Sequence, residues 1–117
     1  MRHRRKTVKL GMERKHRDSV LANLAKALIL HEHVDTTYTR AKAGQRYAER
    51  LITLARRGDG HARRIAFSRI QDKRAIDKLF GEIGPRFGDR PGGYTRVVRL
   101  GPRRGDGAEV ARLMLVE

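Results

Sequence analysis

Cysteine is absent from the 117-residue sequence, which excludes disulfide bonds, thiolate metal sites and cysteine nucleophiles. Long apolar runs are absent too, since none approaches the ~20 residues that a membrane-spanning helix needs. The basic start, residues 1–6, is not followed by the apolar segment of a secretory signal. A chain without cysteine fits a reducing compartment, and we expect a cytoplasmic protein.

Acidic residues are scarce. The chain has 13 Asp and Glu against 28 Lys and Arg, which gives a net charge of +15. Such an excess attracts polyanions, chiefly nucleic acid. An anionic membrane would favour a lysine-rich amphipathic helix with large apolar residues opposite, and the sequence has none, so we expect no membrane partner. With 38% hydrophobic residues, the chain can bury one modest core in a single domain.

The motifs of common catalytic sites are also missing. Glycine is frequent, but neither a phosphate-binding Gly-x-x-x-x-Gly-Lys-Ser/Thr run nor a Gly-x-Ser-x-Gly elbow occurs. The only close histidine pair, His31 and His33, lies two residues apart, whereas a zinc site on a helix needs histidines one turn apart. A histidine that stabilises the C-terminus of a helix is the better explanation. We therefore expect no enzyme, no metal, no cofactor and no small-molecule substrate.

The first segment, residues 1–17, is strongly basic. It holds eight Lys or Arg against one acid, Glu13, and has few apolar side chains. Such a segment cannot bury enough apolar surface to offset its ordering entropy, so we expect an N-terminal arm that orders on RNA. The alternative is a solubilising tail, which would tolerate acidic residues equally well. Residues 18–117 are expected to form the globular domain.

Apolar residues at helical spacing predict four helices between residues 19 and 84. The first is expected from Ser19 to His31, with Asp18 or Ser19 as its N-cap. The second starts near Thr39 and ends at the glycines of residues 58–60, where an aspartate can cap the third. Asp72 is expected to cap the fourth helix, and Gly84-Pro85 is expected to stop it.

The second predicted helix has a basic face. Its apolar residues fall within an arc of about 100°, and basic residues occupy the opposite side. Glu49 is the only acid that interrupts the positive charge. The face either contacts a polyanion or is simply solvated. Its basic residues are Lys42, Arg46, Arg50, Arg56 and Arg57.

Three segments are expected to be strands. Residues 34–39 are rich in β-branched side chains, and residues 94–100 and 109–116 flank a loop of residues 101–107 in a hairpin. The predicted fold is therefore α+β, a single domain in which about four helices pack on a small three-stranded sheet ending in a β-hairpin.

The hairpin region concentrates arginine. Between Arg86 and Arg104 there are six arginines and no lysine, against one acid, Asp89. A guanidinium group binds two phosphate oxygens at once and stacks on bases, which suits shaped RNA. Tyr94 follows two glycines and either stacks on an unpaired base or packs on the core. Because basic residues are spread along the whole chain and no helix-turn-helix pattern occurs, duplex DNA is a less suitable partner.

Short runs along the chain carry a resemblance. They are Met1-Arg2-His3, His16-Arg17, Thr36-Thr37, Ala41-Lys42, Leu51-Ile52-Thr53-Leu54-Ala55, Lys78-Leu79-Phe80, Gly84-Pro85-Arg86 and Gly92-Gly93-Tyr94-Thr95-Arg96. With them the chain resembles the family of bacterial large-subunit ribosomal proteins numbered seventeen. The resemblance implies a structural component of the 50S particle, with a helical, three-stranded α+β domain bound to the large ribosomal RNA near the exit of the peptide tunnel.

The sequence therefore predicts a non-catalytic protein whose partners are large-subunit ribosomal RNA and neighbouring large-subunit ribosomal proteins. The rival hypotheses are a DNA-compacting basic protein and an RNA-modifying enzyme. The candidate RNA contacts are Arg2, His3, Arg4, Arg5, Lys6, Lys9, Arg14, Lys15, His16, Arg17, Arg40, Lys42, Arg46, Arg50, Arg86, Arg90, Tyr94, Arg96, Arg99, Arg103 and Arg104.

Overall fold

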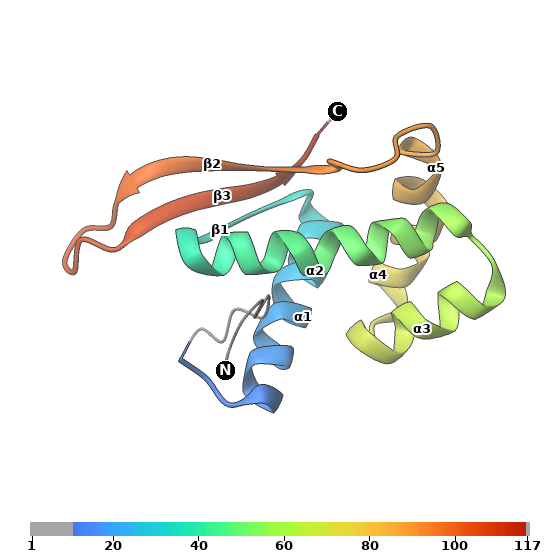
Figure 1. Cartoon of the computed structure of the whole chain (residues 1–117), viewed down its shortest axis with the longest axis horizontal. Coiled ribbons are helices and arrows are strands. Elements are labelled where there is room, and N and C mark those ends of the chain that lie inside the picture. Colours follow the sequence, from blue (N-terminus) through green and yellow to red (C-terminus); the bar gives the residue numbers. More distant parts are fainter. Residues whose placement is uncertain (1–10, 117) are drawn as a thin grey trace, which may run out of the picture.

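The computed structural model of the chain describes residues 11–116, which fold into helices packed on one face of a three-stranded antiparallel sheet (Figure 1). The predicted α+β domain is confirmed. The helical segments are α1 (Arg14–His31), α2 (Tyr38–Arg57), α3 (Gly60–Ile70), α4 (Lys73–Lys78), the π-helical turn η1 (Leu79–Ile83) and α5 (Gly84–Arg86). The strands are β1 (His33–Thr37), β2 (Thr95–Pro102) and β3 (Glu109–Leu115).

The sheet has the order β1-β3-β2, so β3, the last strand in sequence, lies in the centre. β3 pairs with β2 as the predicted hairpin and with β1 on its other edge. Alternate residues of β3 are buried against the helices, namely Ala111, Leu113 and Leu115. A register irregularity between Arg99 and Gly101 bends the outer part of β2, and the hairpin tip projects beyond the helices (Figure 1).

Helix α1 begins earlier than predicted. Its first residue is Arg14, and Asp18 and Ser19, the expected N-cap residues, lie inside the helix. The N-cap is Glu13, whose side chain makes no capping hydrogen bond, while its carbonyl accepts from the Arg17 amide at 2.8 Å. Lysine and arginine are good helix formers, so residues 14–17 continue the helix that the apolar pattern predicts only from residue 19. Four candidate contacts expected in the arm therefore belong to α1.

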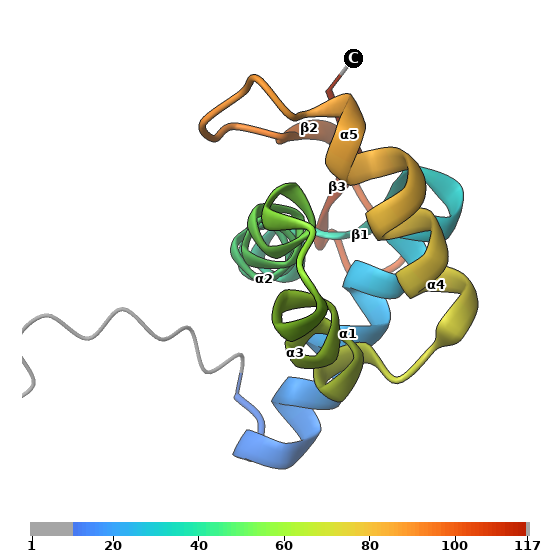
Figure 2. The ribbon, with the colours of Figure 1, turned by 90° about the vertical axis from the view of Figure 1, so that its right-hand side faces the viewer.

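The predicted caps of α3 and α4 are confirmed. Gly58 ends α2 in the left-handed conformation, with φ of 70°, and the Asp59 carboxylate accepts from the Ala62 amide at 2.7 Å. The Asp72 carboxylate likewise accepts from the Ala75 amide at 3.1 Å. Figure 2 shows α2 nearly end-on, beside α1 and α3.

The prediction that Gly84-Pro85 stops the fourth helix is wrong. The helical run continues from α4 through η1 into α5, and it ends at Arg86. Pro85 is tolerated because it lies in the first turn of α5, where the missing amide costs little. Gly84 lies so close to α2 that an added Cβ would be 2.6 Å from the Ala55 carbonyl oxygen. Glycine therefore permits the close packing of α5 on α2.

The core lies between the helices and the inner face of the sheet. Its large, fully buried side chains come from α1, α2, α4, η1, β3 and the segment before β2, and burying each aliphatic one contributes about 1.5–3 kcal/mol. They are Leu28, Ile29, Leu51, Ile52, Ile76, Leu79, Ile83, Tyr94 and Leu113.

Candidate nucleic-acid interface

The basic face of α2 is present, but it is smaller than predicted. Arg40, Lys42, Arg46 and Arg50 are exposed. Arg57 is exposed too, with Nη2 3.1 Å from an Asp59 carboxylate oxygen. Arg56 does not belong to this face, because its Nη1 donates to the Tyr94 hydroxyl at 2.9 Å and its Nη2 donates to the Gly88 carbonyl at 3.2 Å.

Tyr94 packs on the core and is only 1% exposed, which decides between its two predicted roles. Its ring centroid lies 5.4 Å from that of Phe87. A Glu49 carboxylate oxygen accepts from the Tyr94 amide at 3.0 Å and from the Thr95 hydroxyl at 3.2 Å. The ring thus has no free face for a base, and Tyr94 is removed from the candidate contacts.

The six arginines between residues 86 and 104 do not form one cluster of free guanidinium groups. Three of them form ion pairs: Arg86 with Glu32 at 2.6 Å, Arg99 with Glu109 at 3.2 Å, and Arg103 with Asp106. Arg99 also lies over the Tyr38 ring, 4.2 Å from its centroid.

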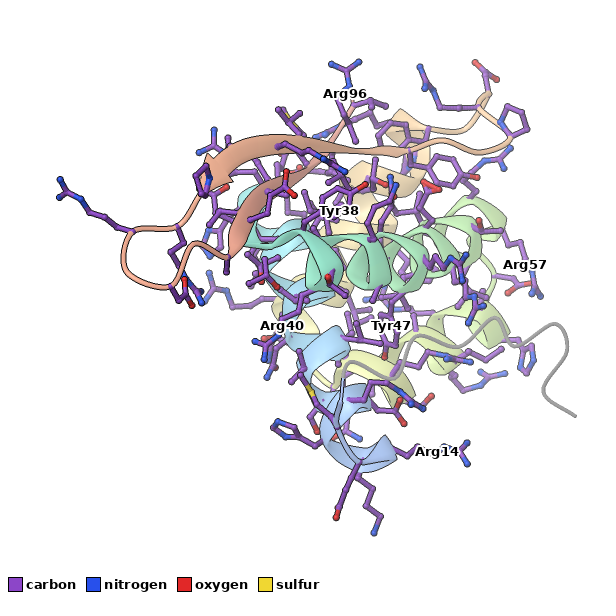
Figure 3. All side chains as sticks on the ribbon, turned by 60° about the vertical axis from the view of Figure 1, so that its left-hand side comes forward. Arg14, Tyr38, Arg40, Tyr47, Arg57 and Arg96 are labelled. Atoms are coloured by element: carbon purple, nitrogen blue, oxygen red, sulfur yellow. The ribbon has the colours of Figure 1, made fainter. Side chains whose placement is uncertain are left out.

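The other three arginines form none of these ion pairs. Arg90 donates to the Gly93 carbonyl at 3.1 Å. Arg96 and Arg104 are exposed, and within residues 11–116 neither has an acidic partner. Figure 3 shows Arg14, Arg40 and Arg96 on well-separated parts of the surface.

Glu32 pairs with two cations. Both of its carboxylate oxygens accept hydrogen bonds from Arg86, and Lys78 Nζ lies 3.3 Å away. The hydrogen bond from Arg86, helped by Lys78, lowers the pKa of Glu32 to about 2. Arg86 therefore joins the end of α1 to α5 and is not a free cation.

Other acids neutralise arginines in the same way. A hydrogen bond from Arg103, with a further one from the Ala108 amide, lowers the pKa of Asp106. Arg112 lowers the pKa of Asp35 across the neighbouring strands β3 and β1. These carboxylates stay ionised and cancel nearby positive charge at neutral pH.

The first turn of α1 is unusually basic. Arg14, Lys15 and His16 are exposed, Arg17 is partly exposed, and the turn contains no acid. Positive side chains are unfavourable beside the positive end of a helix dipole, whereas an anion there is favourable.

Six candidate contacts (Arg2, His3, Arg4, Arg5, Lys6 and Lys9) lie outside the described residues.

Residues 11–116 include no group of three potential metal-ligating side chains. Of the histidine pair, His33 Nδ1 lies 3.2 Å from the His31 carbonyl oxygen. No helix in the described part of the chain is long and apolar enough to cross a membrane.

Comparison with known proteins identifies the family of the chain. Residues 20–116 match the family model described as Ribosomal protein L17. The chain belongs to the ribosomal protein L17 family. The resemblance drawn from the sequence is thereby confirmed, and so is the prediction that the chain is a structural ribosomal protein and not an enzyme.

Three relatives illustrate how much of an L17 protein the chain represents, and each is named Large ribosomal subunit protein bL17. The chain is 51% identical over 108 residues to the protein of Clostridium novyi (strain NT), covering 92% of this chain and 96% of the relative. It is 49% identical to that of Thermomicrobium roseum over 116 residues, 99% of each chain. It is 48% identical to that of Amoebophilus asiaticus (strain 5a2) over its full length, but spans only 60% of that relative.

Two residues of this L17-family chain lie beside candidate RNA contacts but were not predicted from the sequence. Arg69 of α3 and Tyr47 of α2 line the same hollow as Arg14 and Arg17 of α1. The apolar spacing of α3 directed attention to its buried face, so Arg69 at the end of that helix was not considered. Only the packing of three helices brings these side chains together.

Proposed function

We propose that this chain binds large-subunit ribosomal RNA as a constituent of that subunit, mainly through cations that its own acids leave unpaired. Membership of the L17 family supports the part of the proposal that makes the chain a constituent of the large subunit. The observation that carries the RNA contact is a set of exposed cations without an acidic partner in the described part of the chain, spread over α2, β2 and the hairpin loop. They are Arg40, Lys42, Arg50, Arg96 and Arg104.

The wide spacing of these cations suits a folded RNA. A reader of duplex DNA concentrates its contacts in one recognition helix, whereas these residues extend over three elements: three of the five lie in α2, one lies in β2 and one in the hairpin loop. Each phosphate contact releases counterions, so affinity should fall steeply as salt rises. The paired arginines Arg86, Arg99 and Arg103 have a different role in this proposal, which is to hold the shape of the surface.

The N-terminal arm is a second contact in the proposal. Residues 1–13 precede α1, and this segment is expected to order on RNA because phosphates neutralise its charge. The arm thus loses four residues to α1 compared with the boundary predicted at residue 17. On the family resemblance, we place the contact near the exit of the peptide tunnel, with neighbouring large-subunit proteins as further partners.

Sedimentation with 50S particles tests this function. The full chain should stay with the particles through a high-salt wash, and the triple variant Arg40→Ala/Lys42→Ala/Arg50→Ala should be lost from them at lower salt. Lys73→Ala/Arg74→Ala is the control, because these two exposed cations lie on α4, outside the elements that carry the proposed contact. Equal affinity of the wild type for duplex DNA and large-subunit RNA at matched salt would instead support a DNA-compacting protein.

A further inference from the structure

A polar hollow of about 650 Å³ lies between the beginning of α1 and the end of α3. Three guanidinium groups line it, those of Arg14, Arg17 and Arg69, and none of the three forms an ion pair within residues 11–116. Ser19 and Asn23 add neutral hydrogen-bonding groups to the lining. Asp18 is the one acid among the lining residues, so the hollow has an excess of positive charge.

A second hollow, of about 330 Å³, lies between α2 and α3. Its lining is mostly apolar and includes Leu51, Leu54 and Ile65, together with Arg50 and Arg57. Arg57 pairs with Asp59, but Arg50 has no acidic partner in the part of the chain that the structure describes. An apolar slot flanked by arginines is a suitable place for a base attached to a charged backbone.

Tyr47 and Arg69 line both hollows, so the two adjoin. In Figure 3, Tyr47 lies higher than Arg14, at the start of α1, and lower than Arg57, at the end of α2. Burial raises the pKa of Tyr47, and the charges of Arg69 and Asp18 both act on its hydroxyl. We define the two hollows and this shared wall as the α1–α3 groove.

We propose that the α1–α3 groove binds an unpaired RNA nucleotide, with backbone phosphate in the polar hollow and the base in the apolar one. The inference rests on the proposed function and adds to it a specific site. Arginine binds phosphate oxygens in pairs, and unpaired bases are the parts of RNA that proteins commonly take into pockets. The volume of the polar hollow falls in the range of about 300–1,000 Å³ that is typical of small-ligand sites.

An acidic peptide is the other anion that three arginines could bind. Its carboxylates would satisfy the polar hollow, but acidic side chains offer no planar apolar group to the adjoining slot. The pairing of a cationic hollow with an apolar one therefore favours a nucleotide.

Fluorescence anisotropy with the full chain tests the groove. The probes are labelled single-stranded oligouridylate, an abasic ribose-phosphate oligomer of the same length, large-subunit RNA and duplex DNA. Arg69→Ala should weaken oligouridylate binding by about tenfold and lower the salt slope by about 0.7, as expected for one lost charge-assisted phosphate contact. Arg50→Ala should act in the same direction. The control is Arg74→Ala, an exposed α4 residue that lines neither hollow, and it should change affinity by less than about twofold.

Each outcome decides a different part of the inference. The wild type should bind oligouridylate at least about fivefold more tightly than the abasic oligomer if a base enters the slot, and equal affinity would overturn that placement. If polyglutamate displaces labelled oligouridylate as readily as unlabelled oligouridylate does, the groove is a site for acidic peptides and the nucleotide proposal is overturned. If the wild type binds large-subunit RNA more tightly than duplex DNA, but Arg69→Ala and Arg74→Ala have the same affinity for oligouridylate, the groove proposal fails while the proposed function stands. If the wild type shows no such preference, the proposed function itself fails.

Discussion

Arg56 of α2 donates a hydrogen bond from Nη1 to the hydroxyl oxygen of Tyr94, across 2.9 Å and 38 residues of sequence. The guanidinium carbon also lies 5.9 Å from the centre of the Tyr94 ring. Arg56 Nε is buried without a hydrogen-bond partner, and no acid among the described residues pairs with this arginine. Arg56 is therefore a structural cation that fastens the beginning of β2 to α2.

The Tyr94→Phe variant should be less stable than the wild type. It removes the acceptor for Arg56 Nη1 and leaves a partly buried donor unsatisfied, at a cost of about 1–2 kcal/mol. The midpoint of urea denaturation measures the change. Arg96→Ala, at an exposed site, should stay within about 0.5 kcal/mol of the wild type, and an equal loss in both variants would contradict the role given to Tyr94.

Two glycine variants should act in opposite directions. Gly84→Ala places a methyl group against the Ala55 carbonyl, so α5 must move away from α2, at a cost of about 1–3 kcal/mol. Gly81→Ala meets nothing within 4 Å and removes a flexible residue from η1, so it should be neutral or stabilise by up to about 1 kcal/mol. Thermal unfolding of both proteins provides the measurement. A Gly84→Ala protein as stable as Gly81→Ala would disprove the close contact.

Acid should weaken the fold partly through Glu32. Its pKa is lowered from 4.5 to about 2 in the folded chain, so its stabilising effect is complete above pH 4.5 and is lost as the pH falls towards 2. Because the side chain is 41% exposed, solvent screening limits the contribution to at most about 1 kcal/mol. Glu32→Gln should be less stable at neutral pH, and its stability should fall less between pH 4.5 and 2. Parallel pH curves for the two proteins would show that the Arg86 pair contributes nothing.

Paired and unpaired arginines of the hairpin should differ in RNA binding. Arg104→Ala removes an exposed cation without an acidic partner among the described residues, so the slope of log affinity against log salt should fall by about 0.7–0.9. Arg103→Ala releases the Asp106 carboxylate, whose charge then remains uncompensated in the same loop. Arg103→Ala should weaken RNA binding, but the slope of log affinity against log salt should fall less than in Arg104→Ala. Identical salt slopes for the two variants would show that the ion pair does not decide which arginine contacts RNA.

Removal of residues 1–10 should separate RNA binding from stability. The first described helix starts at Arg14, so the truncated chain keeps all of α1. Its melting temperature should stay within a few degrees of the wild type, while its incorporation into 50S particles should fall. Removal of residues 1–17 should lower the melting temperature as well, since it cuts the first turn of α1. Unchanged incorporation after the shorter truncation would leave the arm without a role.

The sequence predicted best the features of the fold that depend on neighbouring residues, such as helix caps. Asp59 and Asp72 cap their helices through a carboxylate that bonds an amide three residues later, and such contacts depend only on nearby sequence. The same reasoning failed at Asp18, a cap-type residue that lies inside α1. It failed again at Pro85, because a proline is also acceptable in the first turn of a helix.

The candidate site was harder to predict, because it depends on contacts between distant residues. Nothing in the sequence indicates that Arg86 meets Glu32, 54 residues away, or that Arg112 meets Asp35, 77 residues away. Counting charges therefore overestimated the free cations of the hairpin. For the same reason it missed Arg69, whose position beside Tyr47 depends on how α2 and α3 pack.

The central position of β3 has a consequence for synthesis. The two outer strands, β1 and β2, pair only with β3, which is the last of the three to leave the ribosome that makes the chain. Until residues 109–115 have emerged, both outer strands lack any partner in the sheet, and each exposes backbone groups that are not paired within the protein. Closure of the sheet therefore waits for β3, and it joins residues 33–37 to residues 109–115.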